Sequence, residues 1–148
     1  LENTINIIKN TYDHNFITLM CKINKNIAYY GSENLLSQVI LNLLTNAKDA
    51  LLAHNIKEKY VYIELFEKNE RIYITIQDNA GGIEHDIQDK IFDPYFTTKH
   101  QSQGTGLGLY ISNQIIETHF NGNIYNENKR LKQQWGSCFT IEFPKGHL

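Results

Sequence analysis

The sequence predicts an α+β fold, a two-layer α/β sandwich in which helices cover one face of a mixed, mostly antiparallel sheet. Three observations lead to this expectation. Several short runs alternate apolar and polar residues, with the period of a strand that buries one face. Two longer runs carry apolar residues at the three-and-four spacing of an amphipathic helix. Their order is strands, helix, hairpin, long loop, helix and closing hairpin, which suits helices layered on one sheet.

The first third of the chain contains a helical segment, two expected strands and the longer helix. Residues 1–12 have roughly helical spacing and are expected to be the tail of an upstream helix or linker, with the domain itself at residues 13–148. Residues 16–23 alternate as a strand, and residues 27–30 are expected to form a short second one. Ser32 is the expected N-cap of the long helix. The apolar stripe of this helix comprises Leu36, Val39, Ile40, Leu43, Leu44, Ala47 and Leu51.

Two hairpins are expected in the rest of the chain. Residues 60–66 and 71–77 are predicted strands with a short polar loop between them. Residues 123–128 and 137–143 form the closing pair, with a polar loop predicted at residues 128–134.

Between the hairpins lie a long irregular stretch and a second helix. The helix is expected from about Gly106 to Phe120, and Gly122 is expected to end it. Residues 79–105 show no clear period apart from a short helical pattern near residues 87–91. Irregular stretches of this length in a compact domain are usually functional, and lids are among them.

Composition excludes several classes of protein. The length of 148 residues suits one domain with a proper core, and a formal net charge of -2 argues against a nucleic-acid or anionic-membrane surface. No apolar run approaches the eighteen residues of a membrane span, so no membrane contact by this domain is expected. Cys21 and Cys138 are expected to be buried thiols in a reducing compartment, which indicates the cytoplasm even if a parent protein is membrane-anchored.

Asp78 is the first candidate for a functional residue. It continues the inward phase of the strand at residues 71–77 and is followed by Asn79, Ala80, Gly81 and Gly82. A carboxylate on the core side needs a donor, and we expect none from its sequence neighbours. The two glycines let the backbone turn sharply and approach a ligand closely. This arrangement predicts a pocket for a flat, donor-bearing group; the alternative is an aspartate that caps a turn or the next helix.

A polar ridge on the long helix is the second candidate. Asn42, Asn46 and Asp49 lie at positions i, i+4 and i+7, beside the apolar stripe. The amide oxygen of asparagine suits Mg²⁺, which takes a few hard oxygen ligands and keeps waters and phosphates for the rest. The alternative is a solvated helix edge, which is common on amphipathic helices.

A glycine-rich run at the start of the second helix is the third candidate, and it comprises Gly104, Thr105, Gly106, Leu107, Gly108 and Leu109. Consecutive bare amides at a helix N-terminus make an anion site. The dinucleotide fingerprint fails because position 109 is leucine and no strand precedes the run, and the phosphate loop of nucleoside triphosphatases is absent. The alternative is a flexible hinge without a ligand.

Aromatic residues and one lysine precede this run. Phe92 and Phe96 could pin a mobile segment to the body of the domain, although simple core filling is the alternative for Phe92. Lys99 is a candidate point charge for a phosphate.

Together these motifs stand in the order found in sensor histidine kinases. Residues 42–47 resemble the N box, residues 78–82 the G1 box, residues 92–99 the F box, residues 104–109 the G2 box, and residues 136–140 the closing strand of that family. The likeness covers roughly residues 16–144, and it implies the Bergerat ATP-binding fold. The ending Phe96-Thr97-Thr98-Lys99 and the pair Asp49-Ala50 look most like the nitrogen-regulatory branch.

The resemblance implies a role for each matched residue. Asp78 would accept from the adenine amino group, Gly82 would let the base lie against backbone, and Ser137 would sit nearby, where the family more often has threonine. Asn46 would bind Mg²⁺, and Asn42, Asn46 and Lys99 would be catalytic. The implied nucleotide-binding residues are Asn42, Asn46, Asp49, Asp78, Gly82, Ile83, Phe92, Phe96, Thr97, Lys99, Gly104, Thr105, Gly106, Leu107, Gly108, Leu109 and Ser137.

The implied activity is transfer of the γ-phosphoryl group of Mg-ATP to a histidine on a separate dimerisation domain, for a downstream response regulator. His14 lies in Tyr-Asp-His-Asn and not in the family's His-Glu pattern, so the chain is expected to be inactive without that acceptor domain. Asn42 stands where hydrolysing relatives of the fold have a glutamate that activates water, and a neutral amide cannot be that base. Two alternatives stay open: an ATPase of the same fold, and a nucleotide-sensing module without activity.

Overall fold

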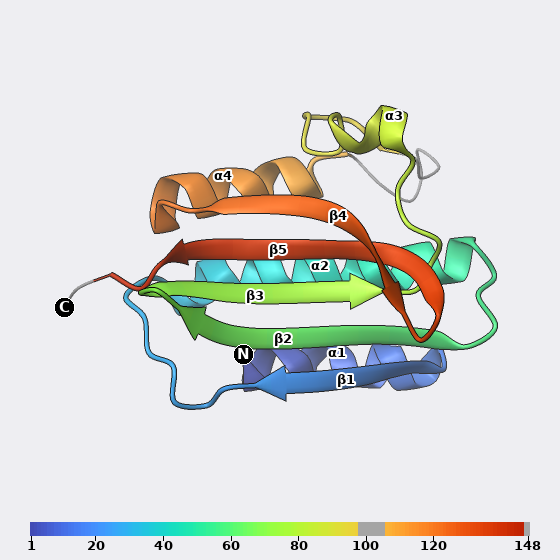
Figure 1. Cartoon of the computed structure of the whole chain (residues 1–148), viewed down its shortest axis with the longest axis horizontal. Helices are drawn as coiled ribbons and strands as arrows, with labels where there is room; N and C mark the ends of the chain where they lie inside the picture. The colour runs from blue at the N-terminus through green and yellow to red at the C-terminus, as the bar shows by residue number, and fades with distance from the viewer. Residues whose placement is uncertain (98–105, 147–148) are drawn as a thin grey trace.

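The computed structural model describes residues 1–97 and 106–146, and it has one five-stranded sheet with helices packed against it (Figure 1). The strands lie in the order β1-β2-β3-β5-β4. Their bounds are β1 Ile17–Ile23, β2 Lys59–Lys68, β3 Arg71–Asp78, β4 Asn123–Leu131 and β5 Gln134–Pro144. The β1–β2 pair is parallel and the other three pairs are antiparallel, which confirms the predicted α+β class and the mixed, mostly antiparallel sheet.

Four helices are described: α1 Glu2–His14, α2 Glu33–Ala53, α3 His85–Gln88 and α4 Gly108–Phe120. In Figure 1, α1 and α2 lie behind the sheet and α4 follows the β4 edge. Helix α2 packs against both α1 and α4 and against β3, so it is the central helix of the layer. Ser32 caps it as predicted, since its Oγ accepts from the Leu35 amide at 3.3 Å. Every residue of the predicted apolar stripe of α2 is buried.

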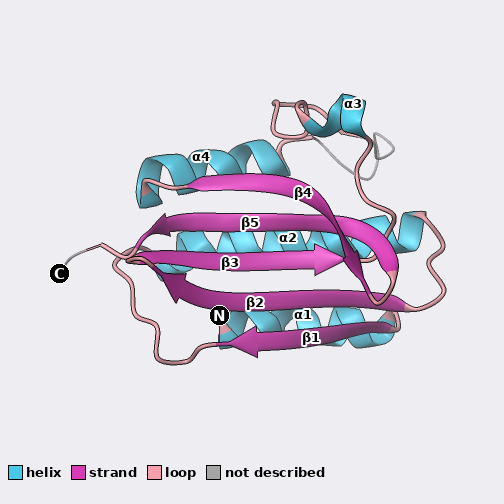
Figure 2. Ribbon diagram, in the orientation of Figure 1, coloured by secondary structure: helices cyan, strands magenta, loops and turns pink. Residues whose placement is uncertain are grey.

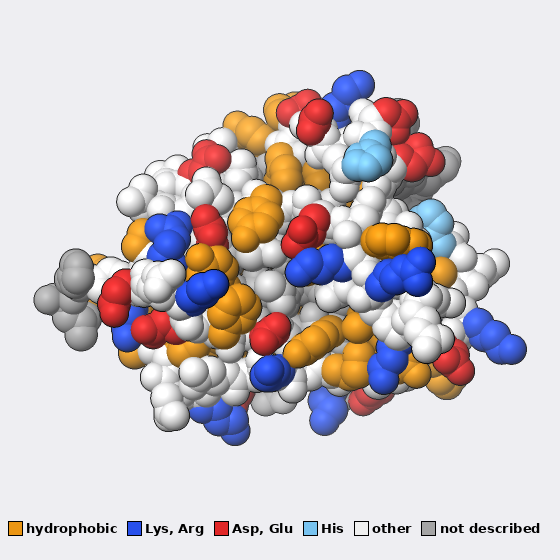
Figure 3. Space-filling view, in the orientation of Figure 1, with side chains coloured by type: hydrophobic (Ala, Val, Ile, Leu, Met, Phe, Trp, Pro, Cys, Tyr) orange, Lys and Arg blue, Asp and Glu red, His pale blue; other side chains and the backbone are white. Residues whose placement is uncertain are grey.

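One face of the sheet forms the core. In β3 the burial alternates strictly, and Ile72, Ile74 and Ile76 point toward the helix layer. Asp78 has the same phase and lies opposite Val61 of β2. The other face carries Phe66 and Tyr73, whose rings stack at 5.0 Å. Figure 3 shows this second face, where hydrophobic and charged side chains are interspersed.

Several sequence expectations are wrong in detail. Residues 27–30 form no strand; they belong to the loop that joins β1 to α2 in Figure 2, where Tyr30 donates one backbone bond to Lys145. Cys21 is exposed, because β1 is the edge strand and its inner face is only partly covered. The β4–β5 connection is only Lys132 and Gln133 rather than residues 128–134. Both have positive φ (53° and 66°), the hairpin turn geometry that matches strand twist.

The end of α4 also differs from expectation. Asn121 adopts the left-handed conformation that ends the helix, with φ 53°. Gly122 is needed for another reason: a Cβ there would overlap the Glu142 carbonyl and would lie 2.7 Å from the Cβ of Phe143. No helix in the described parts of the chain has the length and apolar character to cross a membrane.

Helix α1 packs on the core. Its last turn extends to His14, so the expected boundary between residues 12 and 13 falls inside the helix. The Tyr12 side chain is 1% exposed, and its hydroxyl donates to the Leu44 carbonyl of α2 at 2.6 Å. Near the other end of α1, the hydroxyls of Thr4 and Ser37 are hydrogen-bonded. Two polar contacts therefore fix α1 along α2.

We expect Tyr12→Phe to lower the free energy of unfolding by about 1 kcal/mol, the net value of one buried neutral hydrogen bond, because the ring packing is retained. Urea denaturation measures the change. The matched control is Tyr30→Phe, because Tyr30 is 65% exposed and should lose nothing. Equal stability of both variants would show that the Tyr12–Leu44 bond does not stabilise α1.

Candidate functional site

A cavity of about 1190 Å³ opens between α2, the end of β3, the segment after it, the start of α4 and β5. This is slightly larger than the roughly 300–1,000 Å³ that is usual for small-molecule pockets. It brings together residues from five separate parts of the sequence. Those predicted for the site that line it are Asn42, Asn46, Asp49, Asp78, Gly82, Ile83, Phe96, Thr97, Gly106, Gly108, Leu109 and Ser137.

The remaining predicted residues fall into two groups. Phe92 and Leu107 do not line the cavity; the ring of Phe92 packs edge-on against Phe139 at 6.2 Å, as the core-filling alternative expects. Lys99, Gly104 and Thr105 lie outside the described residues.

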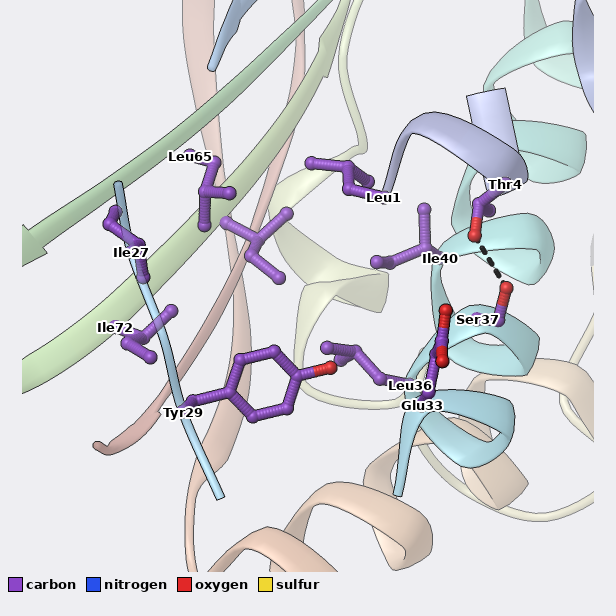
Figure 4. Close-up of a pocket in the computed structure, with 11 residues that line it drawn as sticks. Leu1, Thr4, Ile27, Tyr29, Glu33, Leu36, Ser37, Ile40, Leu65 and Ile72 are labelled. Atoms are coloured by element: carbon purple, nitrogen blue, oxygen red, sulfur yellow. Dashed lines mark hydrogen bonds between the residues drawn. The ribbon is translucent and has the colours of Figure 1, made fainter. Parts of the chain in front are cut away.

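A second, smaller cavity of about 130 Å³ lies between α1, α2 and the sheet (Figure 4). In Figure 4 the Tyr29 ring and the side chains of Leu36 and Ile40 point into it, and Glu33 lies at its edge. No residue predicted for the site lines this cavity.

Asp78 is the only buried carboxylate in the described parts of the chain, at 4% exposure, and it faces the large cavity. One of its oxygens accepts from the amides of Ala80 at 2.9 Å and Ser137 at 3.2 Å. The expectation that no sequence neighbour supplies a donor is therefore wrong, because the chain turns at Ala80 and its amide reaches back. Burial raises the pKa of Asp78, and the two amides and nearby His54 oppose that rise.

The raised pKa of Asp78 has a consequence for stability. Between the ordinary carboxyl pKa and the raised one, the folded state binds more protons than the unfolded state, so the contribution of Asp78 to stability falls as pH rises through that window. Above that window the ionised side chain is a net cost to the nucleotide-free fold. We expect Asp78→Asn to unfold at an equal or higher temperature than the parent at pH 7, since asparagine Oδ1 can accept both amide bonds.

Thermal unfolding at several pH values tests this expectation. The advantage of Asp78→Asn should shrink as pH falls below the raised pKa. Exposed Asp86 offers the control substitution Asp86→Asn. A large loss of stability in Asp78→Asn at pH 7 would contradict the assignment.

Glycines allow the backbone to pass close to Asp78. Gly81 and Gly82 have φ of 101° and 85°, and the Gly81 amide donates to the Trp135 carbonyl at 2.8 Å. A Cβ at Gly136 would overlap the Asp78 carbonyl, so only glycine fits where β5 crosses the end of β3. The local sequence therefore brings β5, and Ser137 with it, to the carboxylate.

The polar ridge of α2 meets the start of α4. The Asn42 Nδ2 donates to the Ser112 Oγ at 3.1 Å. A Cβ at Gly108 would overlap the Asn42 side chain. Asn46 and Asp49 line the cavity one and two turns further along, and Lys48 pairs with Asp49 at 3.5 Å. Leu107, the N-cap residue of α4, makes no side-chain capping bond, and the first residues of the helix, Gly108 and Leu109, line the cavity. The first amides of a helix carry partial positive charge and favour an anion.

The sequence reasoning missed part of the lining. Ile76, Ile91 and Phe139 form an apolar wall, and His54 lies at the C-cap of α2. Ile76 has the same inward phase as Asp78 on β3, and Phe139 of β5 lies opposite Ile76, so strand phase and pairing could have placed both beside Asp78. Within the described residues, no group of three or more histidine, cysteine or acidic side chains could hold a metal ion alone.

Comparison with known proteins gives consistent matches. The family model "Histidine kinase-, DNA gyrase B-, and HSP90-like ATPase" matches residues 31–147. The chain is 37% identical over 117 residues to the two-component sensor PprA of Pseudomonas aeruginosa, covering 77% of this chain and 12% of that protein. It is 38% identical over 109 residues to the sensor histidine kinase ZraS of Escherichia coli, and the match covers 74% of this chain and 21% of that protein. The chain thus spans only a small part of these relatives.

Solved structures agree with the fold. A nucleotide-free form of the catalytic domain of histidine kinase ThkA superposes with a TM-score of 0.83 at 26% identity, covering 97% of this chain and 89% of that one. A structure of ThkA in complex with response regulator protein TrrA superposes with a TM-score of 0.78 at 23% identity. The match covers 98% of this chain and 39% of that one.

Proposed function

Since the chain belongs to the histidine kinase-, DNA gyrase B- and HSP90-like ATPase family, as a catalytic ATP-binding domain of the sensor histidine kinase type, we propose that it transfers the γ-phosphoryl group of ATP to a histidine on a separate helical domain. The observation that carries the proposal is Asp78, a buried carboxylate that faces a cavity of about 1190 Å³. The N-terminus of α4 borders the same cavity. One space thus offers an acceptor for a base and donors for phosphates.

We propose that Asp78 accepts from the exocyclic amino group of adenine. A carboxylate has about four lone-pair sites, and the Ala80 and Ser137 amides share one of its oxygens, so the group has capacity for a further donor. Gly82 and Ile83 lie beside it, and the apolar side chains of Ile76 and Phe139 would exclude water from the base.

The phosphates would lie toward the start of α4. There the first amides of the helix would stabilise negative charge, with Lys99 and the glycines of residues 104–108 assisting. Magnesium fits the donor set as an ion carried mainly by the phosphates and waters, with the Asn46 amide oxygen as a protein ligand, because no acidic cluster among the described residues could hold it alone. When bound, it would neutralise charge on the transferring group.

Transfer is favoured over hydrolysis by the chemistry of α2. Asn42 is neutral, and its amide group is engaged by Ser112. It therefore cannot act as a general base for water at this position. The work left to the protein is positioning and charge stabilisation, as in other phosphoryl transfers.

The proposed protein partners are the helical domain that carries the acceptor histidine and a response regulator downstream of it. The ThkA complex with TrrA supports the second by analogy of fold. The residues Phe96-Thr97-Thr98-Lys99 and Asp49-Ala50 favour the nitrogen-regulatory branch of the family.

Phosphotransfer tests the proposed function directly. The chain is incubated with γ-labelled ATP and a protein that carries the acceptor helices. An acid-labile, base-stable label on those helices is the expected result. Steady phosphate release without any acceptor would instead indicate an ATPase, and ATP binding with neither outcome would indicate a nucleotide-sensing module.

A further inference from the structure

An asparagine on β4 holds the backbone of the glycine turn that follows Asp78. The Asn128 Oδ1 accepts from the Ile83 amide at 2.9 Å, and its Nδ2 donates to the Ile83 carbonyl, also at 2.9 Å. One side-chain amide thus satisfies both backbone groups of one residue, as a neighbouring strand would. These two residues are 45 positions apart in sequence, so the contact is a tertiary one.

The turn fits closely against this amide. Gly82 has φ 85°, and a Cβ there would lie 2.7 Å from the Asn128 Oδ1. Gly82 and Ile83 both line the large cavity beside Asp78. The Asn128 side chain therefore fixes the position of the wall of the cavity next to the carboxylate.

A second asparagine, two residues earlier on the same face of β4, continues the connection. The Asn126 Nδ2 donates to the Ser137 Oγ, and its Oδ1 accepts from the Gln88 Nε2 of α3 at 3.2 Å. The Ser137 amide in turn donates to Asp78. The two asparagines thus tie the glycine turn, α3 and β5 to a single strand.

We propose that Asn128 is a positioning residue for the adenine base: by holding the backbone N–H and carbonyl of Ile83, it sets the distance between that wall and Asp78. The proposal rests on the proposed function, because it takes the base to lie at Asp78. A turn that is already ordered loses little freedom when the nucleotide binds, and preorganisation of this kind increases affinity and base selectivity. Alanine would remove both bonds, and aspartate would keep the acceptor but place a second oxygen against the Ile83 carbonyl.

The experiment measures ATP and GTP affinity of the 148-residue chain and its Asn128→Ala and Asn128→Asp variants by titration calorimetry. The two bonds are present with and without nucleotide, so their loss lowers affinity only through the cost of reordering the released turn; this cost is at most their net value, about tenfold in affinity. We expect both variants to bind ATP more weakly, by up to about tenfold, and to lose most of the preference for ATP over GTP. The control is Asn123→Ala, at an exposed position of the same strand, which should change neither.

Hydrogen exchange at the Ile83 amide separates positioning from general damage. Faster exchange at Ile83 in Asn128→Ala, together with unchanged protection of Ile74 in β3 and the loss of ATP preference, supports the proposal. Unchanged affinity and unchanged ATP preference in a variant whose Ile83 amide exchanges faster would overturn it. Neither readout needs an acceptor domain, so a failure of phosphotransfer would be seen separately.

Discussion

Asp78→Asn is expected to weaken ATP binding by at least about tenfold, because a hydrogen bond to a charged acceptor contributes roughly 1.5–3 kcal/mol. The variant replaces an oxygen that faces the cavity with an amide group that can turn an N–H toward the adenine amino group. The two backbone donors, Ala80 and Ser137, keep their acceptor, so the local structure should persist. Titration calorimetry with ATP measures the loss.

The nucleotide-free stability of Asp78→Asn is the internal control. Since the buried carboxylate has a raised pKa, removing its charge should not lower the unfolding temperature at pH 7. Weaker binding by a fully folded protein is therefore the expected combination. ATP affinity equal to that of the parent would remove Asp78 from the nucleotide site.

Asn46→Ala is expected to reduce magnesium-dependent phosphotransfer by about a hundredfold or more, the order of cost when one preorganised electrostatic group is removed from a transition state. Asn46 lines the cavity one helical turn beyond Asn42. Asn46→Asp keeps an oxygen but adds a charge and removes the amide donor, so it should also be impaired. Initial rates of labelling of the acceptor helices across a magnesium titration measure both effects.

The control for Asn46 is Asn113→Ala. Asn113 also lies on a helix, but its side chain bonds to Glu117 at the surface of α4. This control should transfer phosphate at the parental rate. Full activity in either Asn46 variant would exclude this residue as the metal ligand.

The regular elements could be predicted from sequence wherever one face is buried. The alternation of Ile72, Ile74 and Ile76 fixed the phase of β3 and placed Asp78 on the core side, as the structure has it. The prediction was wrong where burial is weak. Cys21 is exposed on the edge strand β1, and residues 27–30 belong to a loop and not to a strand.

The hydrogen-bond acceptors and glycines of the candidate site could be predicted from sequence, but the residues that hold its backbone in place could not. Asn42 and Asn46 lie four residues apart on α2, so their spacing predicted one helix face, and the phase of β3 placed Asp78 on the core side. The Asn128 side chain is hydrogen-bonded to the backbone of a turn that is distant in sequence, and no local sequence pattern predicts such a contact. The roles of Lys99, Gly104 and Thr105 stay predictions, because these residues lie outside the described part of the chain.

The most direct measurement compares two ligands on two proteins: ATP and purine riboside triphosphate, which lacks the exocyclic amino group, each titrated into the parent chain and into Asp78→Asn. If the carboxylate accepts from that amino group, the parent should prefer ATP by about tenfold or more, and the variant should bind both ligands with similar, weak affinity. An ATP preference that is equally large in both proteins would contradict the account, because the amino group would then be recognised elsewhere.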